Sequence, residues 1–253
     1  MTRLRLRPPR LPDPMPGVLD LHCHLLAAVD DGPPDLASAQ ALIAGLRQQG
    51  VDSAVATPHL LSPRFAADGL EAMIAAAWPR LQEQAAAAGL RVFLGAENHC
   101  SGQHDPEAFA RTARPLGDGP CVLVELPDDH LPARAWDSCF ALVRAGRRPV
   151  LAHPERCRGL RGDDEGLAAF VASGGLLQIT VGHVAGVHGW SMRWRSRRLL
   201  ARFPQACVLA SDAHDVRARR PAWDRLPAKF RRWICPDLPS LATFGLGVSP
   251  PRP

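Results

Sequence analysis

The chain of 253 residues contains no tyrosine and a single lysine, Lys229, although arginine is abundant. It therefore cannot itself carry phosphotyrosine. Arginine in place of lysine, together with much alanine and proline, is typical of a GC-rich bacterial genome. The net charge of +5 is therefore weak evidence for an acidic partner. We expect no nucleic-acid partner, and we interpret the basic clusters at 193–202 and 217–220 as solvated helix faces.

Cysteine pairs at metal-binding or redox spacing are also missing. The seven cysteines are an odd number and include no C-x-x-C pair, which argues against a disulfide framework and against a zinc ribbon. None of them is followed six positions later by arginine, the spacing of thiolate-based tyrosine phosphatases. Cys23 is expected to be a small buried residue. This pattern fits a reducing, cytoplasmic location.

Long apolar runs are absent as well. No run approaches the roughly 18 residues needed to cross a membrane, and residues 1–16 carry charges and prolines where a signal peptide needs an apolar stretch. We expect neither export nor membrane insertion. Residues 1–16 are predicted to be a flexible basic tail, or a misassigned start if translation begins at Met15. Residues 17–253 are predicted to form one domain, with a proline-rich tail from Cys235 to Pro253. The sequence leaves the oligomeric state open.

Apolar runs and helical patterns alternate along the chain, with Gly50, Gly89 and Gly146 where helix C-caps are expected. The predicted strands are 18–22, 52–56, 91–95, 121–125, 149–152, 176–180 and 207–210. The predicted helices are 36–49, 69–88, 133–145, 164–172 and 192–203. Continuously apolar strands joined by helices indicate a parallel α/β fold. We expect an irregular (β/α)7 TIM-like barrel, because a ring brings the ends of all strands to one mouth.

Potential metal ligands follow nearly every predicted strand. The first strand leads into Asp20-Leu21-His22-Cys23-His24, where alternation along an extended strand points both imidazoles to one side. The candidate ligands are His22, His24, Asp31, His59, Glu97, Glu125, His153, Asp212 and His214. Imidazoles mixed with bridging carboxylates suit a cluster of Zn, Mn or Fe ions, since one ion does not need nine ligands. His99, His104, His130, His183 and His188 lack this placement and are expected to be loop or surface residues.

These motifs resemble those of the polymerase-and-histidinol-phosphatase (PHP) superfamily, and within it the bacterial capsule and exopolysaccharide tyrosine-protein phosphatases. The most specific landmarks are Val29-Asp30-Asp31-Gly32, Ala56-Thr57-Pro58-His59 and Ala152-His153-Pro154-Glu155-Arg156. The resemblance covers nearly the whole chain. Leu60, where many relatives have a second histidine, and the Gly-rich stretch after Thr180 depart from the family pattern.

The resemblance implies a centre of three divalent metal ions, with Mn as the first expectation and Fe, Zn or Mg as alternatives. It assigns His22, His24, Glu97 and Asp212 to one ion. It assigns Glu97, Glu125 and His153 to a second, and Asp31, His59 and His214 to a third. Arg156 and Arg219 match the family's phosphate-binding arginines, and with Asp212 and His214 they form the implied catalytic set.

The implied function is metal-dependent hydrolysis of phosphotyrosine in a protein, with a bacterial tyrosine autokinase of polysaccharide export as the expected partner. A histidinol-phosphate phosphatase or another PHP phosphoesterase is the first alternative, because it would share the metals. The second is a noncatalytic metalloprotein that only binds a phosphorylated partner. Turnover of a phosphoester separates the two classes.

Overall fold

The computed structural model describes residues 17–65, 69–235, 244 and 246. The predicted N-terminal tail, and the predicted C-terminal tail apart from Cys235, Phe244 and Leu246, lie outside these residues. The strands are β1 (Val18–Cys23), β2 (Val51–Ala56), β3 (His59–Leu60), β4 (Arg91–Leu94), β5 (Glu97–His99), β6 (Cys121–Glu125), β7 (Arg148–Ala152), β8 (Leu176–Thr180) and β9 (Cys207–Ala210). The helices are α1 (Leu36–Gln48), α2 (Leu70–Ala87), α3 (Pro106–Thr112), α4 (Ala135–Arg144), α5 (Asp164–Ala172), α6 (Val181–Ala185) and α7 (Trp190–Arg202). Short 3-10 helices cover Arg158–Leu160, Trp223–Arg225 and Ala228–Trp233.

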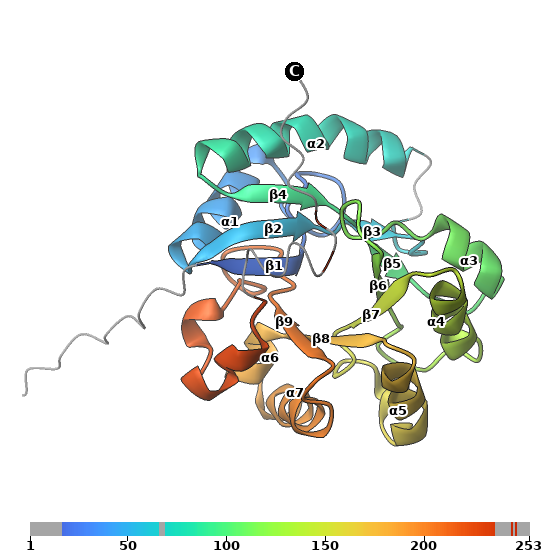
Figure 1. Cartoon of the computed structure of the whole chain (residues 1–253). Coiled ribbons are helices and arrows are strands. Elements are labelled where there is room, and N and C mark those ends of the chain that lie inside the picture. The colour runs from blue at the N-terminus through green and yellow to red at the C-terminus, as the bar shows by residue number, and fades with distance from the viewer. Residues whose placement is uncertain (1–16, 66–68, 236–243, 245, 247–253) are drawn as a thin grey trace, which may run out of the picture.

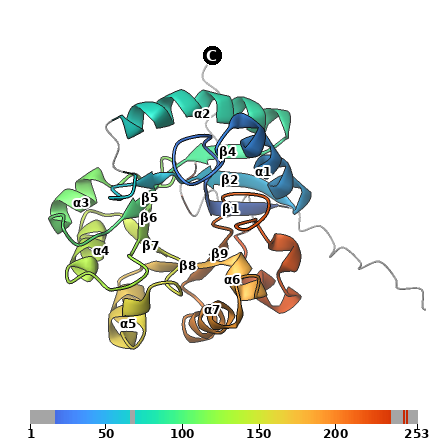
Figure 2. The same ribbon diagram turned by 180° about the vertical axis from the view of Figure 1, so that it is seen from behind.

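All strand pairs are parallel, which confirms the predicted α/β class. The strands form two sheets, with the orders β1-β2-β4 and β3-β5-β6-β7-β8-β9. Figure 1 shows them around a shared centre with helices outside, and Figure 2 shows α3, α4, α5 and α7 outside the larger sheet from behind. Among the described residues β1 meets the segment after β9 only through an isolated bridge, Cys23 to Ala213, so the ladders do not close into one continuous barrel.

Two of the seven predicted strands are each followed, after a two-residue break, by a short strand that was not predicted, which explains the nine strands observed. Thr57-Pro58 separates β2 from β3, because a proline has no backbone N–H to donate to a ladder. Gly95-Ala96 separates β4 from β5 at the same level. The pairing then resumes with His59 opposite Glu97. His59 and Glu97 therefore lie in the larger sheet, although the strands that precede them, β2 and β4, belong to the smaller one.

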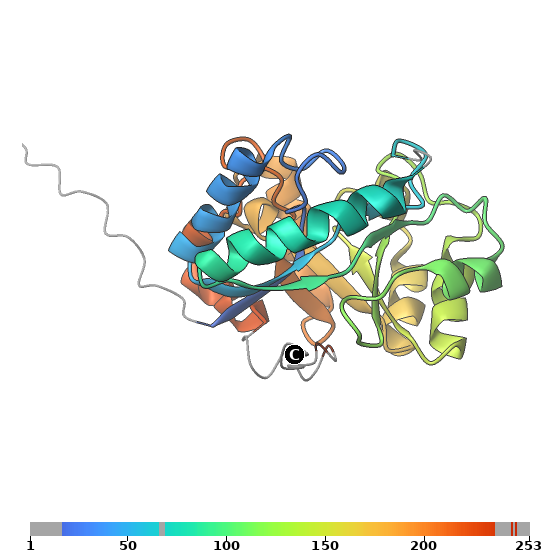
Figure 3. The ribbon, with the colours of Figure 1, turned by 90° about the horizontal axis from the view of Figure 1, so that it is seen from above.

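Side chains alternate along the strands between two apolar layers. Leu19, Val55, Leu123 and Val150 belong to a cluster contributed by strands of both sheets, which Phe244 and Leu246 complete. Alternate residues such as Val122, Leu151 and Leu177 pack with helix residues in the larger cluster. Figure 3 shows α2 lying across the strands of the smaller sheet. The apolar interior supports the strand ends that carry the candidate ligands. Within the described residues, no helix combines the length and hydropathy required to span a membrane.

The predicted helix stops are confirmed, because Gly50, Gly89 and Gly146 all have positive φ. Gly159 is restricted for another reason. A Cβ atom built on Gly159 would lie 2.0 Å from the backbone N of Leu131, whereas nothing lies within 4 Å of one built on Gly146. Gly159 thus lets the segment after the His-Pro-Glu-Arg motif pack directly on the backbone of residues 130–131.

We expect Gly159→Ala to lower the free energy of unfolding by about 3 kcal/mol, because the contacted atoms are backbone and cannot move aside alone. Gly146→Ala is the matched control and should cost about 1 kcal/mol for its positive φ. Urea denaturation of the metal-free proteins measures both. Equal losses in the two variants would contradict the proposed backbone contact.

Candidate metal centre and active site

The two histidines at the end of β1 are oriented by residues from elsewhere in the chain. His22 and His24 are both buried. Nδ1 of His22 lies 2.8 Å from Oε1 of Gln178, and Nδ1 of His24 lies 2.7 Å from Oδ2 of Asp30. Each ring therefore has one nitrogen fixed by a partner, and its Nε2 faces the other ligands. A partner of this kind sets the tautomer and direction of a metal-binding imidazole.

Glu97, the first residue of β5, lies at the centre of the histidines. Its Oε2 is 3.3 Å from Nε2 of both His22 and His24 and 3.2 Å from Nδ1 of His59. Its Oε1 is 2.7 Å from Nε2 of His153. Burial alone would raise the pKa of this carboxyl, but His22 and His59 hold it well below its usual range. Glu97 is thus a carboxylate with both oxygens engaged.

Asp31, in the loop after β1, forms a second junction. Its Oδ1 lies 3.3 Å from Nε2 of His59 and 3.1 Å from Nε2 of His214. Its Oδ2 accepts a hydrogen bond of 2.9 Å from Arg219. The rings of His24 and His214 are stacked at 3.7 Å between centroids. Asp31 therefore connects two histidines at the site to an arginine at its mouth.

Asp212 joins the histidines to both candidate phosphate-binding arginines. Its Oδ1 is 3.5 Å from Nε2 of His22, and it accepts hydrogen bonds from Arg156 at 3.3 Å and from Arg219 at 3.2 Å. Asp212 and His153 each follow a strand and have positive φ, 52° and 30°. Backbone strain at non-glycine residues persists only where the surroundings hold it, and it clusters at functional sites. Here it turns two candidate ligands toward the shared centre.

The histidine protonation states reflect this concentration of negative charge. Burial lowers the pKa of His59, but Glu97 and Asp31 outweigh it and raise the pKa to about 11. Burial likewise lowers the pKa of His24, and Asp30 outweighs it, so that the pKa is about 9. Burial and the neighbouring His24 lower the pKa of His214 to about 4. In the metal-free chain, two imidazolium groups therefore help to balance the carboxylates.

The geometry of these residues fits metal ions. Four buried ring nitrogens have no hydrogen-bond partner: Nε2 of His22, Nε2 of His24, Nδ1 of His59 and Nε2 of His214. Seven separations of 3.1 to 3.8 Å join these nitrogens to carboxylate oxygens without hydrogen-bond geometry. Ligands bound at about 2.1 Å to one ion lie roughly 3.0 to 3.5 Å apart, depending on the coordination angle. Five of the seven separations fall in that range, as expected of atoms that share an ion.

All nine sequence-predicted ligands come together at this centre, in four overlapping groups. The groups are His24, Asp31, His59 and His214; His22, His24 and Asp212; His22, Glu97 and His153; and His59, Glu97 and Glu125. They differ from the division implied by the family resemblance in four ways. His24 also joins the Asp31 group, and His153 groups with His22 and not with Glu125. His59 also groups with Glu97 and Glu125, and Glu97 is not in the group of His22, His24 and Asp212. The distribution of ligands among ions stays a prediction.

Several site residues could not be identified, or were not identified, from the sequence. Asp30 and Gln178 orient histidines through contacts between distant segments, which no local pattern reveals. The expectation for His99 is wrong: it lies in β5 with its Nδ1 2.9 Å from Oε2 of Glu125. Its position two residues after Glu97 is the same period-two signal that identified His22 and His24.

Two further expectations are corrected. His183 is buried in α6, where its Nδ1 lies 2.8 Å from Oε1 of Glu155, because the Glu155 carboxylate inside the protein needs a partner. The segment 217–220 is a loop and not a helix face, and its Arg219 contacts Asp31 and Asp212. His104, His130 and His188 are exposed, and Cys23 is buried, as predicted.

A hollow of about 290 Å³ opens beside the centre. It is lined by Arg156, Thr180, His183, His188, Ser211, Asp212, Arg219 and Arg220. Arg156 is held at Nη2 by Asp128 at 2.9 Å, and Asp212 and Asp128 raise its pKa although burial alone would lower it. The guanidinium groups of Arg156 and Arg219 are therefore fixed, permanently charged donors at the edge of this hollow. A planar guanidinium matches the oxygens of a phosphate group.

The chain is similar to known proteins over most of its length. A tyrosine-protein phosphatase of Bacillus subtilis, YwqE, is 33% identical over 214 residues, which cover 80% of this chain and 79% of that protein. The tyrosine-protein phosphatase CpsB of Streptococcus pneumoniae is 26% identical over 84% of this chain and 91% of its own. A solved structure from work on YwqE and CpsB, described as unique metal-dependent tyrosine phosphatases, superposes with a TM-score of 0.75 at 30% identity, covering 89% of this chain and 91% of that one.

The family model for capsular polysaccharide synthesis proteins, CpsB/CapC, matches residues 18–234. This range begins at β1 and includes every candidate ligand and both arginines described above. The chain therefore belongs to the CpsB/CapC family of capsular polysaccharide synthesis.

Proposed function

We propose that this protein is a metal-dependent phosphatase that hydrolyses phosphotyrosine in a protein substrate. The observation that carries the proposal is the joining of the centre to Arg156 and Arg219 through one carboxylate, Asp212. Divalent ions held by the nine ligands would supply the Lewis acidity needed for attack of water on phosphorus. The related phosphatases of Bacillus and Streptococcus support the same substrate class.

The residues of the chain have separate tasks in this reaction. Arg156 and Arg219 bind the phosphoryl oxygens, and Asp212 and Asp128 keep the two guanidinium groups in position. Gln178 and Asp30 hold His22 and His24 so that their free nitrogens point inward. Preorganised charge of this kind stabilises the negative charge that a transferring phosphoryl group carries.

A cysteine nucleophile does not fit the structure. All seven cysteines are buried and outside disulfides, and none of them lines the hollow beside Arg156. Burial raises the pKa of Cys23, the cysteine between the two β1 histidines, well above its usual value. A thiol of that kind is not a thiolate at neutral pH. This supports direct attack by water in place of a phosphocysteine step.

We propose three ions, with Mn as the physiological metal, and a bacterial tyrosine autokinase of polysaccharide export as the substrate. We also propose a cytoplasmic location, supported by seven cysteines that form no disulfide, which suits a reducing compartment. A preference for histidinol phosphate over a phosphotyrosyl peptide would instead place the protein in amino-acid biosynthesis. Binding without turnover of either substrate would make it a noncatalytic protein.

His59→Ala is expected to remove at least one ion per chain and to abolish hydrolysis of a phosphotyrosyl peptide, because His59 touches both Asp31 and Glu97. Inductively coupled plasma mass spectrometry counts the metal, and phosphate release measures activity. The exposed His104→Ala variant is the matched control and should retain both. Full activity of the wild-type protein after complete removal of metal would refute the metal-dependent reaction.

Metal uptake should release at least two protons per chain near pH 7.5, because an imidazole binds metal only when it is neutral. His24 and His59, with pKa values raised to about 9 and about 11, are protonated there in the metal-free chain. Metal affinity should therefore fall as the pH is lowered. Calorimetric titration with Mn²⁺ in two buffers of different ionisation enthalpy gives the proton count. Identical heats in the two buffers would show that no proton is released.

Arg156→Lys should lower kcat/KM for a phosphotyrosyl peptide by about 10- to 100-fold, because an ammonium group keeps the charge but loses the two-pronged contact. The metal content should be unchanged. Arg111→Lys on the exposed surface of α3 is the control. Steady-state kinetics test the pair. A loss that disappears when the metal is replenished would assign Arg156 to metal retention and not to the phosphate.

A further inference from the structure

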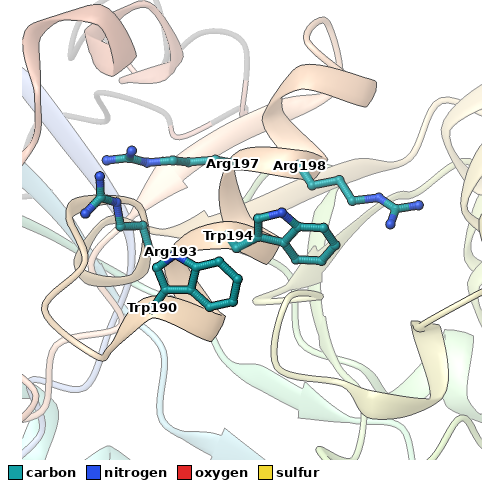
Figure 4. A pocket seen from close by; sticks show the side chains of 5 residues that line it. All are labelled: Trp190, Arg193, Trp194, Arg197 and Arg198. Carbon is teal, nitrogen blue, oxygen red and sulfur yellow. The ribbon is translucent and has the colours of Figure 1, made fainter.

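Helix α7 presents two tryptophans to solvent. Trp190 is 75% exposed and Trp194 is 50% exposed, although the inner face of the same helix is buried through Ser196 and Leu200. The indoles are one turn apart, and Figure 4 shows them together on the helix with Arg193 and Arg197 to one side and Arg198 to the other. These five side chains line a hollow of about 430 Å³. A large aromatic side chain left in water is a common mark of a contact surface.

Several arginines on the face of the protein that carries the indoles have no acidic partner. Among the described residues, Arg158, Arg161, Arg193 and Arg195 form no ion pair with a carboxylate. Burial, Arg161 and Arg158 together lower the pKa of Arg195, which shows that these cations crowd one another. The positive charge of this face is therefore not balanced within the described chain.

The carboxylates close to this face are already engaged. Asp128 pairs with Arg156, and Glu155 is buried against His183. Asp164 pairs with Arg198 and Arg202. None of the three is available to the four unpaired arginines in this structure. An external anion would supply the missing charge.

Adjacent hollows connect this face to the mouth of the active site. The hollow beside the metal centre shares Arg156, His183 and His188 with a second one of about 400 Å³. The second hollow shares Arg161 and Arg195 with a third hollow of about 250 Å³. The third hollow shares Trp194 and Arg198 with the hollow between the indoles. The result is a continuous track, defined here as Arg158, Arg161, Arg195, Arg198, Trp194 and Trp190.

We propose that this track docks an acidic segment of the phosphoprotein substrate that flanks the phosphotyrosine being hydrolysed. The inference rests on the proposed phosphatase function. Guanidinium groups pair with carboxylates in the same planar geometry that they use for phosphate, and the indoles cover apolar side chains between the acidic residues. The section of α7 from 190 to 198 is about 12 Å long, which corresponds to roughly four residues of extended peptide.

A peptide suits the track better than a flat membrane surface does. The third hollow is a recess whose lining includes Cys157, Leu160 and Leu167, which are all buried. A recess accepts single side chains, whereas a helix lying on a bilayer needs a continuous apolar stripe. On α7 the exposed indoles alternate with arginines, and the track leads directly to the phosphate-binding arginines.

The test compares three phosphotyrosyl peptides with the metal-loaded, full-length protein. One carries about six acidic residues before the phosphotyrosine, one carries them after it, and one has neutral Gly/Ser flanks. One of the acidic peptides should have a KM about 10-fold below that of the neutral peptide, with kcat unchanged. The advantage should shrink as salt is raised, because exposed charges are screened.

The double variant Arg161→Glu with Trp194→Ala should erase the preference for the acidic peptide and leave hydrolysis of the neutral peptide unaltered. Arg158→Glu alone changes a track arginine that forms no ion pair among the described residues; it should reduce the preference and provides a test if the double variant does not fold. Arg111→Glu on α3 is the matched charge-reversal control and should keep the full preference. Circular dichroism melting curves identify variants that are not folded.

The outcomes separate the two proposals. Equal KM values for all three peptides would overturn the docking track while the observed hydrolysis upheld the phosphatase function. Hydrolysis of none of them would reject the phosphatase function and, with it, the docking role. Sedimentation with vesicles containing phosphatidylglycerol that is lost in the double variant, without any peptide preference, would overturn the peptide proposal in favour of a membrane surface.

Discussion

The structure depends on one buried carboxylate. Glu97 lies between four imidazoles at the ends of the strands, where an isolated charge would cost several kcal/mol without compensation. Its neighbours must therefore carry positive charge, as protons on the histidines or as metal ions in their place. Asp30 and Gln178 fix the outer nitrogens of His22 and His24, so the inner nitrogens stay directed at this charge. The centre is thus held by a balance of charge as well as by packing.

The strands make this balance compatible with a stable core. Alternation along each strand sends one set of side chains into an apolar interior and the other set against the helices. The polar residues gather where the strands end and the backbone turns, with His153 and Asp212 in strained conformations. The apolar core residues therefore lie along the strands, whereas the candidate ligands lie at or just after the strand ends. This separation lets the hollow beside Arg156 be polar without weakening the interior.

Much of this arrangement could be predicted from sequence, because it depends on local periodicity. The strand 121–125 and the helix 164–172 have the predicted bounds, and all nine predicted ligands meet at one centre. Short elements were missed: β3 has two residues, and α3 is signalled only by Asp105, whose side chain caps the helix, and by Pro106. The Gln178 contact joins residues 156 positions apart, and no window of sequence contains both partners. The breaks between β2 and β3 and between β4 and β5 likewise become visible only when neighbouring strands are compared.

The order of the ligands along the chain has a consequence for the synthesis of the protein. His22 and His24 are made near the beginning, whereas Asp212, His214 and Arg219 follow only after the last strand. Two of the four ligand groups lack a member until that point. A growing chain therefore carries exposed histidines without the partners that would define their coordination. The two groups that contain Asp212 or His214 can therefore form only at the final stage of synthesis, and a fragment cut anywhere before residue 212 is not a smaller version of the same centre.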